Sequence, residues 1–240
     1  MSTVLITGGS RGIGEAIARR FHKEGWNVII NYSKNAQRAA ALAEALPGSM
    51  AICADVADPE AVRQMFSVIK EKFGHVDVLV NNAGIAQDGL FIELTEADWR
   101  HIFDVNFFGA VHCIREALPD MLNNRMGKIL NISSIWGLKG ASCESAYAST
   151  KAALIGLTRS LAKEYGLSGV RVNCIAPGVI DTEMNAVYTE ETMNALRDEI
   201  PLGRIGSAQD VAELAWFLCS PAADYITGQV ISSDGGWNIA

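Results

Sequence analysis

The stretch that decides the fold is Thr3-Val4-Leu5-Ile6-Thr7-Gly8-Gly9-Ser10-Arg11-Gly12-Ile13-Gly14, close to the amino terminus. Its first five residues are apolar or β-branched, which predicts a strand buried on both faces, as in a parallel sheet. A helix is predicted from Glu15 to Glu24, so the glycines occupy the turn between strand and helix. Glycines let a backbone approach phosphate groups, and a helix N-terminus offers free N–H groups. The stretch therefore predicts a phosphate-binding turn in the first unit of an α/β fold.

Strand-like and helix-like segments alternate through the rest of the chain. Further strands are predicted at 27–31, 50–54, 77–80, 128–132, 170–176 and 229–232. Helices are predicted at 37–46, 58–72, 95–118, 147–165 and 207–219, and three of them begin at capping sequences led by Asp58, Thr95 and Ser207. This alternation, without a linker or internal repeat, predicts α/β architecture: one doubly wound domain over 1–240, with helices on both faces of a parallel sheet.

Composition narrows the class of protein. The chain has 240 residues, 49% of them hydrophobic, and a formal charge of −7, which argues against nucleic acid as the main partner. No apolar run approaches the roughly 18 residues of a membrane span, and the N-terminus lacks the pattern of a signal peptide. The five cysteines are scattered and the four histidines show no metal spacing, so we expect reduced thiols, no metal and a cytoplasmic location.

The residues after the second predicted strand indicate which cofactor binds. An NAD site usually has an acidic residue there to bind the ribose 2′-hydroxyl. This chain has no Asp or Glu from 25 to 43, but offers Ser33, Lys34 and Arg38, with Arg11 in the glycine turn. Cations and hydroxyls suit a 2′-phosphate, which predicts NADP(H). The alternative is that Lys34 and Arg38 are exposed charges on the next helix.

Tyr147 and Lys151 indicate the chemistry. Residues four apart lie on one face of a helix, and a cation beside a phenol lowers the phenol's pKa toward a range useful for proton transfer. Ser134, just after a predicted strand, offers a hydroxyl that can hold a carbonyl oxygen. With a hydride carrier alongside, these groups suit reduction of a ketone or oxidation of an alcohol. By itself a Tyr-x-x-x-Lys pair is more often a core tyrosine and a solvated lysine.

Other polar residues fall at carboxyl ends of predicted strands, where ligands bind in open α/β sheets. Asp55 and Val56 follow the third strand and are expected near an adenine. Residues 81–84 (Asn-Asn-Ala-Gly) follow the fourth strand and are expected to contact the cofactor or support its loop. Residues 182–201 are polar and acidic, and we expect them to form a helical lid over the substrate.

Together these motifs resemble the short-chain dehydrogenase/reductase family over essentially the whole chain. The resemblance rests on the glycine turn, residues 81–84, Ser134, the Tyr147/Lys151 pair and the Pro177-Gly178 pair. It implies a seven-stranded parallel sheet in the order 3-2-1-4-5-6-7, in a single Rossmann domain. It also implies a homotetramer or homodimer.

The resemblance assigns roles to particular residues. Tyr147 would be the acid, Ser134 would orient the carbonyl, Lys151 would lower the tyrosine pKa and hold the nicotinamide ribose, and Asn106 would support a water on the proton path. Ser133 is the alternative serine. The expected cofactor-binding residues are Gly8, Ser10, Arg11, Gly12, Ile13, Gly14, Ser33, Asp55, Val56, Asn82, Ala83, Gly84, Tyr147, Lys151, Pro177, Gly178, Ile180 and Thr182.

Within the family the chain is most similar to 3-oxoacyl-[acyl-carrier-protein] reductases of fatty acid synthesis, especially over 201–206 and 225–229. That likeness implies an NADPH-dependent oxidoreductase whose ketone substrate is a small molecule or is bound to a carrier protein. Arg125 fits one of two basic positions used to dock acyl carrier protein, but Ser168 stands at the other.

Trp136 and Glu144 would lie near the substrate, and a carboxylate there suits a cation. They resemble reductases of an aminoketone attached to a lysine of elongation factor P, which is the alternative substrate. A free alcohol, sugar or steroid comes third. A protein of another class, a non-catalytic NADP sensor or scaffold, would be free to lose catalytic groups, whereas all four positions are filled here.

Overall fold

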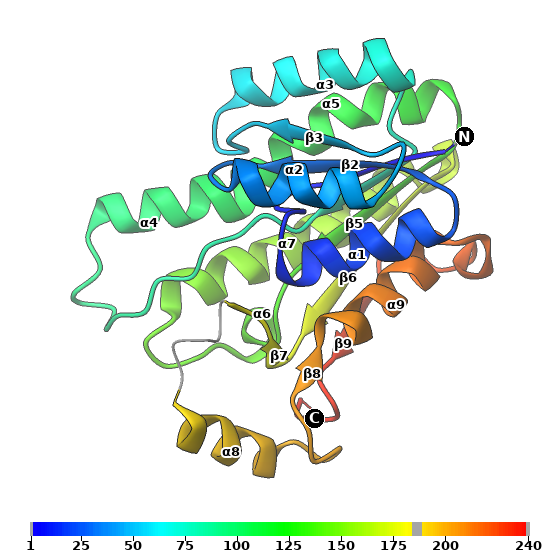
Figure 1. Cartoon of the computed structure of the whole chain (residues 1–240). Coiled ribbons are helices and arrows are strands. Elements are labelled where there is room, and N and C mark those ends of the chain that lie inside the picture. Colours follow the sequence, from blue (N-terminus) through cyan, green and yellow to red (C-terminus); the bar gives the residue numbers. More distant parts are fainter. Residues whose placement is uncertain (1, 184–188, 239–240) are drawn as a thin grey trace.

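The computed structural model describes residues 2–183 and 189–238 (Figure 1). Seven parallel strands form the central sheet in the spatial order β3-β2-β1-β4-β5-β6-β9. These strands are β1 Thr3–Ile6, β2 Asn27–Tyr32, β3 Met50–Cys53, β4 Val78–Asn81, β5 Gly127–Ile132, β6 Val170–Pro177 and β9 Val230–Ser233. Because β9 is the seventh strand of this sheet, the predicted order 3-2-1-4-5-6-7 is confirmed.

Helices cover both faces of the sheet, as the alternating sequence predicted. One face carries α1 (Gly12–Lys23), α2 (Ala36–Ala45) and α9 (Ala208–Cys219). The other carries α3 (Pro59–Phe73), α5 (Gly109–Asn123) and α7 (Ser145–Tyr165).

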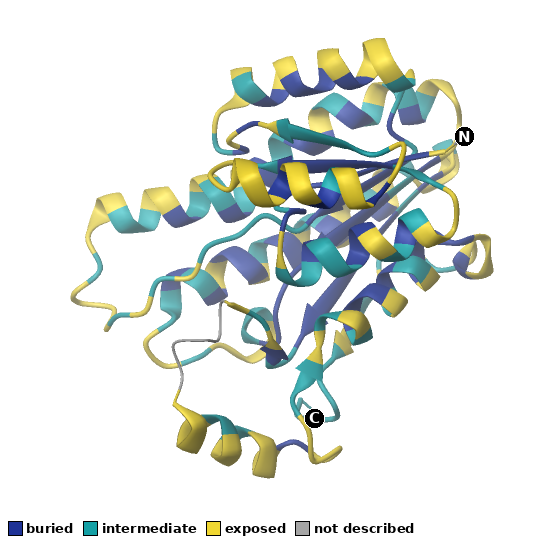
Figure 2. Cartoon of the chain, viewed as in Figure 1, coloured by how far each residue is buried: buried dark blue, intermediate teal, exposed yellow. Residues whose placement is uncertain are grey.

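Alternate residues of each strand point to opposite faces, so the sheet divides the core in two. Val4 and Ile6 pack in the cluster under α1, whereas Leu5 between them packs in the cluster under α3 and α5. Figure 2 shows the result: the strands are mostly buried and the helices are exposed on their outer sides. A sheet covered on both faces leaves the ends of its strands and the connecting loops to form a site, and in open α/β sheets ligands bind at the carboxyl ends.

The predicted capping residues begin their helices. Asp58 accepts a hydrogen bond from the backbone N–H of Glu60, and Pro59 stands at the first helical position. Thr95 with Asp98, and Ser207 with Asp210, each form a reciprocal capping box. These caps satisfy N–H groups that have no partner within the helix, which fixes where each helix starts.

The helix predicted over 95–118 is wrong in one respect, because it is interrupted. It consists of α4 (Glu96–Phe103), a π-helical turn (Asp104–Phe108) and then α5. A π turn holds one extra residue, which shifts the apolar pattern by one position without ending it. Sequence periodicity therefore could not separate the pieces.

Several short elements were not predicted. Helix α6 covers Trp136–Lys139, and β7 (Ile180–Asp181) pairs with β8 (Gly206–Ser207) in a separate two-stranded sheet. Short 3-10 turns cover Gly166–Ser168 and Pro221–Ala223. Elements of two to four residues carry too little periodicity to be recognised.

The predicted segment 182–201 is helical in its second part, where α8 spans Glu190–Glu199. Residues 184–188 of that segment lie outside the described residues. Among the helices that the structure describes, none has the length and apolar character needed to cross a membrane.

Candidate active site

The glycine turn is shaped so that side chains stay out of it. Gly8 and Gly12 have φ of +60° and +53°, a region that residues with a Cβ rarely enter. A Cβ on Gly14 would lie 2.4 Å from the carbonyl oxygen of Gly8. The N-cap residue of α1, Arg11, makes no side-chain cap hydrogen bond within the described chain. The first N–H groups of α1 are therefore available to a ligand, and a phosphate suits them.

Residues 82 and 83 support this turn from the neighbouring strand. The Thr7 hydroxyl accepts hydrogen bonds from the backbone N–H groups of Asn82 and Ala83, both at 3.0 Å. The Asn82 side-chain amide donates to the carbonyl oxygens of Thr7 and Gly8, at 2.9 and 3.1 Å. Of the two roles expected for this motif, loop support is thus visible in the hydrogen bonds.

Thr7 and Asn31 are supporting residues that the sequence analysis missed. Asn31 is 1% exposed, accepts from the Gly8 N–H at 3.3 Å and donates to the Ala54 carbonyl at 2.9 Å. It thereby links the glycine turn to the end of β3. A buried polar side chain nearly always has a partner. A polar residue at the end of an apolar strand was the available signal for both.

Two adjoining cavities lie at the carboxyl edge of the sheet, with volumes of about 360 and 560 Å³. The first collects these predicted cofactor residues: Gly8, Ser10, Arg11, Gly12, Ile13, Ser33, Asp55, Val56, Asn82, Ala83, Gly84 and Thr182. The second adds Tyr147, Lys151, Pro177, Gly178 and Ile180. Gly14 lines neither, since it is buried behind the turn. Apart from Gly14, the structure thus brings the predicted cofactor residues together along two adjoining cavities.

The two serines differ in what their hydroxyls do. The Ser133 hydroxyl is buried and donates to the backbone carbonyl of Lys151 at 2.8 Å. The Ser134 oxygen accepts from the Trp136 N–H at 3.2 Å, and among the described residues its hydroxyl hydrogen has no acceptor. Ser134 is therefore prepared to donate to a substrate oxygen, and the geometry favours it over Ser133.

Lys151 is a buried cation at the base of the second cavity. Its Nζ donates to the Ile132 carbonyl at 2.9 Å and lies 5.5 Å from the centre of the Tyr147 ring. Burial lowers the pKa of Lys151 to about 8. The predicted alternative, a solvated lysine beside a core tyrosine, is wrong for Lys151, which is 3% exposed.

Asn106 lies in the π-helical turn, against the helix that carries Tyr147 and Lys151. Its amide donates to the Ile85 carbonyl at 2.9 Å and to the Thr150 hydroxyl at 3.1 Å, and its Oδ1 accepts from the Ile85 N–H at 2.8 Å. Both amide hydrogens are thus used within the protein. The expected water contact could then involve only Oδ1 or the backbone carbonyl. π turns often occur at functional sites.

The outer wall of the second cavity is aromatic and acidic. Trp136 and Trp237 meet edge to face at 5.3 Å, and the Lys139 Nζ lies 5.1 and 4.5 Å from their ring centres. Glu144 and Asp88 line the same cavity. Burial and the neighbouring Asp88 raise the pKa of Glu144, while a hydrogen bond with Trp136 opposes that rise. Trp237 packs against Trp136 but does not line the cavity. Neither Asp88 nor Trp237 was predicted, since only the fold brings them next to Glu144 and Trp136.

Arg125 and Ser168 do not lie at this cavity. Arg125 comes just before β5 and Ser168 just before β6, where the Gly127 N–H donates to the Gly169 carbonyl at 3.3 Å. Parallel strands run in one direction, so both residues lie at the amino edge of the sheet. The cavity is at the opposite, carboxyl edge.

Comparison with known proteins places this geometry in a family. Residues 8–238 match a family model described as Enoyl-(Acyl carrier protein) reductase. The chain is 42% identical to 3-oxoacyl-[acyl-carrier-protein] reductase FabG of Staphylococcus aureus (strain Mu50) over 238 residues, 98% of this chain and 97% of that protein. It is 41% identical to the FabG of Aquifex aeolicus, covering 97% of this chain and 95% of that protein. For the FabG of Thermotoga maritima the identity is 38%, covering 97% and 96%.

The sheet order, the glycine turn and the Tyr147/Lys151 pair define an oxidoreductase that acts on a C–OH or C=O group. The chain belongs to the short-chain dehydrogenase/reductase family. Within that family, the relatives that share about two residues in five with it are 3-oxoacyl-[acyl-carrier-protein] reductases.

Proposed function

We propose that this protein reduces the 3-oxo group of an acyl chain carried on acyl carrier protein to a 3-hydroxy group, with NADPH as reductant. The observation that carries the proposal is the convergence of Ser134, Tyr147 and Lys151 on one cavity that adjoins the glycine turn. Identity with FabG proteins over nearly the whole chain supports the substrate class.

Side chains of the protein both position the carbonyl group and supply the proton. The Ser134 hydroxyl donates to the carbonyl oxygen and holds it in front of the tyrosine. Tyr147 then protonates that oxygen as it becomes an alkoxide. Lys151, a cation below its pKa of about 8, stabilises the phenolate left on Tyr147.

The cofactor path fits NADPH by the chemistry of its groups. Bound NADPH supplies the hydride that adds to the carbonyl carbon, so one hydride and one proton convert the ketone to a secondary alcohol. The glycine turn and the start of α1 would hold the diphosphate. Arg11, Arg38 and Ser33 would hold the 2′-phosphate, and Lys151 the nicotinamide ribose.

The test is consumption of NADPH with a 3-oxoacyl carrier protein, run beside NADH and beside the matching 2-enoyl substrate. The enoyl arm is included because the description of the matching family model names an enoyl reductase. We expect turnover with the 3-oxo substrate and NADPH, and a loss of about 10²- to 10⁴-fold in Tyr147→Phe, which removes only the proton donor. Tight NADPH binding without turnover of the 3-oxo substrate would overturn the assignment.

A second candidate is a ketone that carries a positively charged amine, such as an aminoketone attached to a lysine of elongation factor P. The observation favouring it is the pair of carboxylates, Asp88 and Glu144, in the substrate cavity. Asp88 disfavours the charge on Glu144, and a cation bound between the two carboxylates would be attracted to both. Trp136 and Trp237 already pack against the ammonium group of Lys139.

Two ketones of equal length, one ending in an ammonium group and one in a methyl group, distinguish these candidates. A higher kcat/KM for the ammonium ketone than for both the methyl ketone and the 3-oxoacyl carrier protein would favour the second candidate. The reverse order would favour the first.

We propose further that the protein is a homotetramer or homodimer that works in the cytoplasm, and that 182–201 covers the substrate. Thr192 and Leu196 of α8 line the substrate cavity, which supports the covering role. Phe91 and Ile92 are 71% and 88% exposed, and large exposed apolar groups often lie at subunit contacts. Light scattering measures the oligomeric state directly, and a monomer would contradict the proposed tetramer or dimer.

A further inference from the structure

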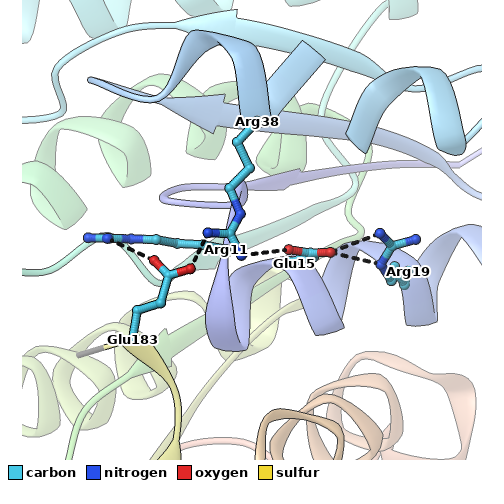
Figure 3. Close-up of polar contacts among 5 residues, drawn as sticks. All are labelled: Arg11, Glu15, Arg19, Arg38 and Glu183. Carbon is cyan, nitrogen blue, oxygen red and sulfur yellow. Dashed lines mark hydrogen bonds and ion pairs between the residues drawn. The ribbon is translucent and has the colours of Figure 1, made fainter. Parts of the chain in front are cut away.

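Glu183, just after β7, reaches two arginines that come from distant parts of the chain (Figure 3). Arg11 of the glycine turn lies 3.2 Å from its Oε2, and Arg38 of α2 contacts its Oε1. These partners are 172 and 145 residues away in sequence. Hydrogen bonds from Arg38 and Arg11 lower the pKa of Glu183, so its carboxylate is charged at neutral pH.

The same two arginines are among the three cations, with Lys34, that the sequence offers to a 2′-phosphate. A carboxylate and a phosphate are recognised by guanidinium groups in the same way, through charge-assisted hydrogen bonds to oxygen atoms. Glu183 and Arg11 both line the cofactor cavity, beside Ser33. Arg38 lines neither cavity but contacts the same carboxylate. In this structure a carboxylate from the protein itself therefore occupies Arg11, a donor in the cofactor cavity, and Arg38 beside it.

We propose that Glu183 is an internal competitor for the 2′-phosphate, which sets how strongly the protein prefers NADPH over NADH. The inference rests on the proposed use of NADPH. The phosphate has to displace the carboxylate from Arg11 and Arg38, because two anions repel each other at one set of donors. A cofactor without the 2′-phosphate leaves these ion pairs in place, so Glu183 lowers affinity for NADPH selectively.

Arg38 has a second carboxylate partner that provides the matched control. Glu15 of α1 lies 3.7 Å from Arg38 and is also bonded by Arg19 at 2.8 Å. Glu15 lines neither cavity. It therefore keeps Arg38 in position after Glu183 leaves, without competing for the phosphate. Replacing either glutamate removes the same charge near the same arginine, but only Glu183 occupies the site.

The experiment measures dissociation constants of NADPH and NADH for the wild type and for Glu183→Gln, Glu183→Asp and Glu15→Gln. The ion pairs of Glu183 are about half exposed, so a modest effect is expected. Glu183→Gln should bind NADPH about three- to tenfold more tightly and NADH within about twofold of the wild type. Glu183→Asp, which keeps the charge on a shorter side chain, should lie between, and Glu15→Gln should stay within about twofold.

Arginine variants separate failure of this inference from failure of NADPH use. If the wild type binds both nucleotides equally and Arg11→Ala with Arg38→Ala changes neither constant, the proposed 2′-phosphate site is wrong. If these arginine variants lose NADPH preference while Glu183→Gln binds like the wild type, the competitor role is overturned. An equal gain in Glu15→Gln would also overturn it, since general charge loss would then explain the change.

Discussion

The inner and outer parts of this active site are built differently. Asn106 and Lys151 are at most 3% exposed, and their polar atoms are hydrogen-bonded to the protein. Trp136, Glu144 and Asp88 of the outer wall are only partly buried or exposed. Trp136 (in α6) and Glu144 come from the connection between β5 and α7, and Asp88 from the one after β4. Buried polar groups tolerate little change, whereas half-exposed charges are worth little individually. We therefore expect the inner part to set the chemistry and the outer part to adjust which substrate enters.

Within the inner part, substitutions of the two adjacent serines, Ser133 and Ser134, should differ most in their effects. Ser134→Ala removes the hydroxyl that we propose holds the carbonyl oxygen, so we expect kcat/KM to fall about 10²- to 10³-fold with stability unchanged. Ser133→Ala removes a buried hydrogen bond to the Lys151 carbonyl. It should instead lower the free energy of unfolding by about 1 kcal/mol and leave kcat/KM within about threefold. Kinetics and urea denaturation of both variants check this, and the opposite pattern would assign the chemistry to Ser133.

We expect substitutions in the glycine turn to be as damaging as substitutions of the proposed catalytic groups. A Cβ at Gly14 would lie 2.4 Å from the Gly8 carbonyl oxygen and 2.7 Å from the Asn82 amide nitrogen. We expect Gly14→Ala to destabilise the protein by about 1–3 kcal/mol and to weaken NADPH binding.

Gly156 is the control for this variant. It lies exposed within α7, with nothing within 4 Å of a built Cβ. Gly156→Ala should stabilise by about 0.5–1 kcal/mol, because alanine favours a helix. Thermal denaturation with and without NADPH measures both variants. Unchanged nucleotide binding in Gly14→Ala would show that the turn does not hold the cofactor.

Substitution of Lys151 tests whether its buried charge lowers the stability of the protein. Burial holds its pKa near 8, below the ordinary value of 10.5, so between these pH values the unfolded chain binds more protons. The stability contribution of Lys151 is therefore lowest below pH 8 and rises as the pH increases toward 10.5. Lys151→Met should abolish most activity.

The same substitution also changes the pH dependence of folding. At pH 7, removal of the buried charge should raise the free energy of unfolding of Lys151→Met by about 1–3 kcal/mol relative to the wild type. Loss of the hydrogen bond to Ile132 should lower it by about 1 kcal/mol. The gain from removing the charge should shrink as the pH rises from 8 to 10. The lost hydrogen bond lowers the free energy of unfolding equally at each pH. The slope of the stability difference against pH therefore reports the buried charge alone. A difference independent of pH would contradict this account.

The contrast between inner and outer parts also explains what the sequence could predict. Tyr147 and Lys151 lie one turn apart on a helix, and the glycine turn is continuous in sequence, so local spacing was sufficient. The pairing of Glu183 with Arg38 and the approach of Trp237 to Trp136 depend on the packing of distant segments. The π turn at Asn106 changes backbone hydrogen bonds while preserving the apolar pattern. These features required the structure.

The smallest expected effect lies in the outer wall, at Glu144. Glu144→Gln keeps the shape of the side chain and removes a charge that burial and Asp88 already disfavour. Stability should therefore hardly change, and kcat/KM for a neutral 3-oxoacyl substrate should rise by about two- to fivefold. For a ketone with an ammonium group it should fall by a similar factor, because one of two attracting carboxylates is lost. Glu71→Gln, an exposed change on α3 with the same loss of charge, should alter neither value. A drop of 10²-fold for both ketones would place Glu144 among the inner, catalytic groups and remove the distinction drawn above.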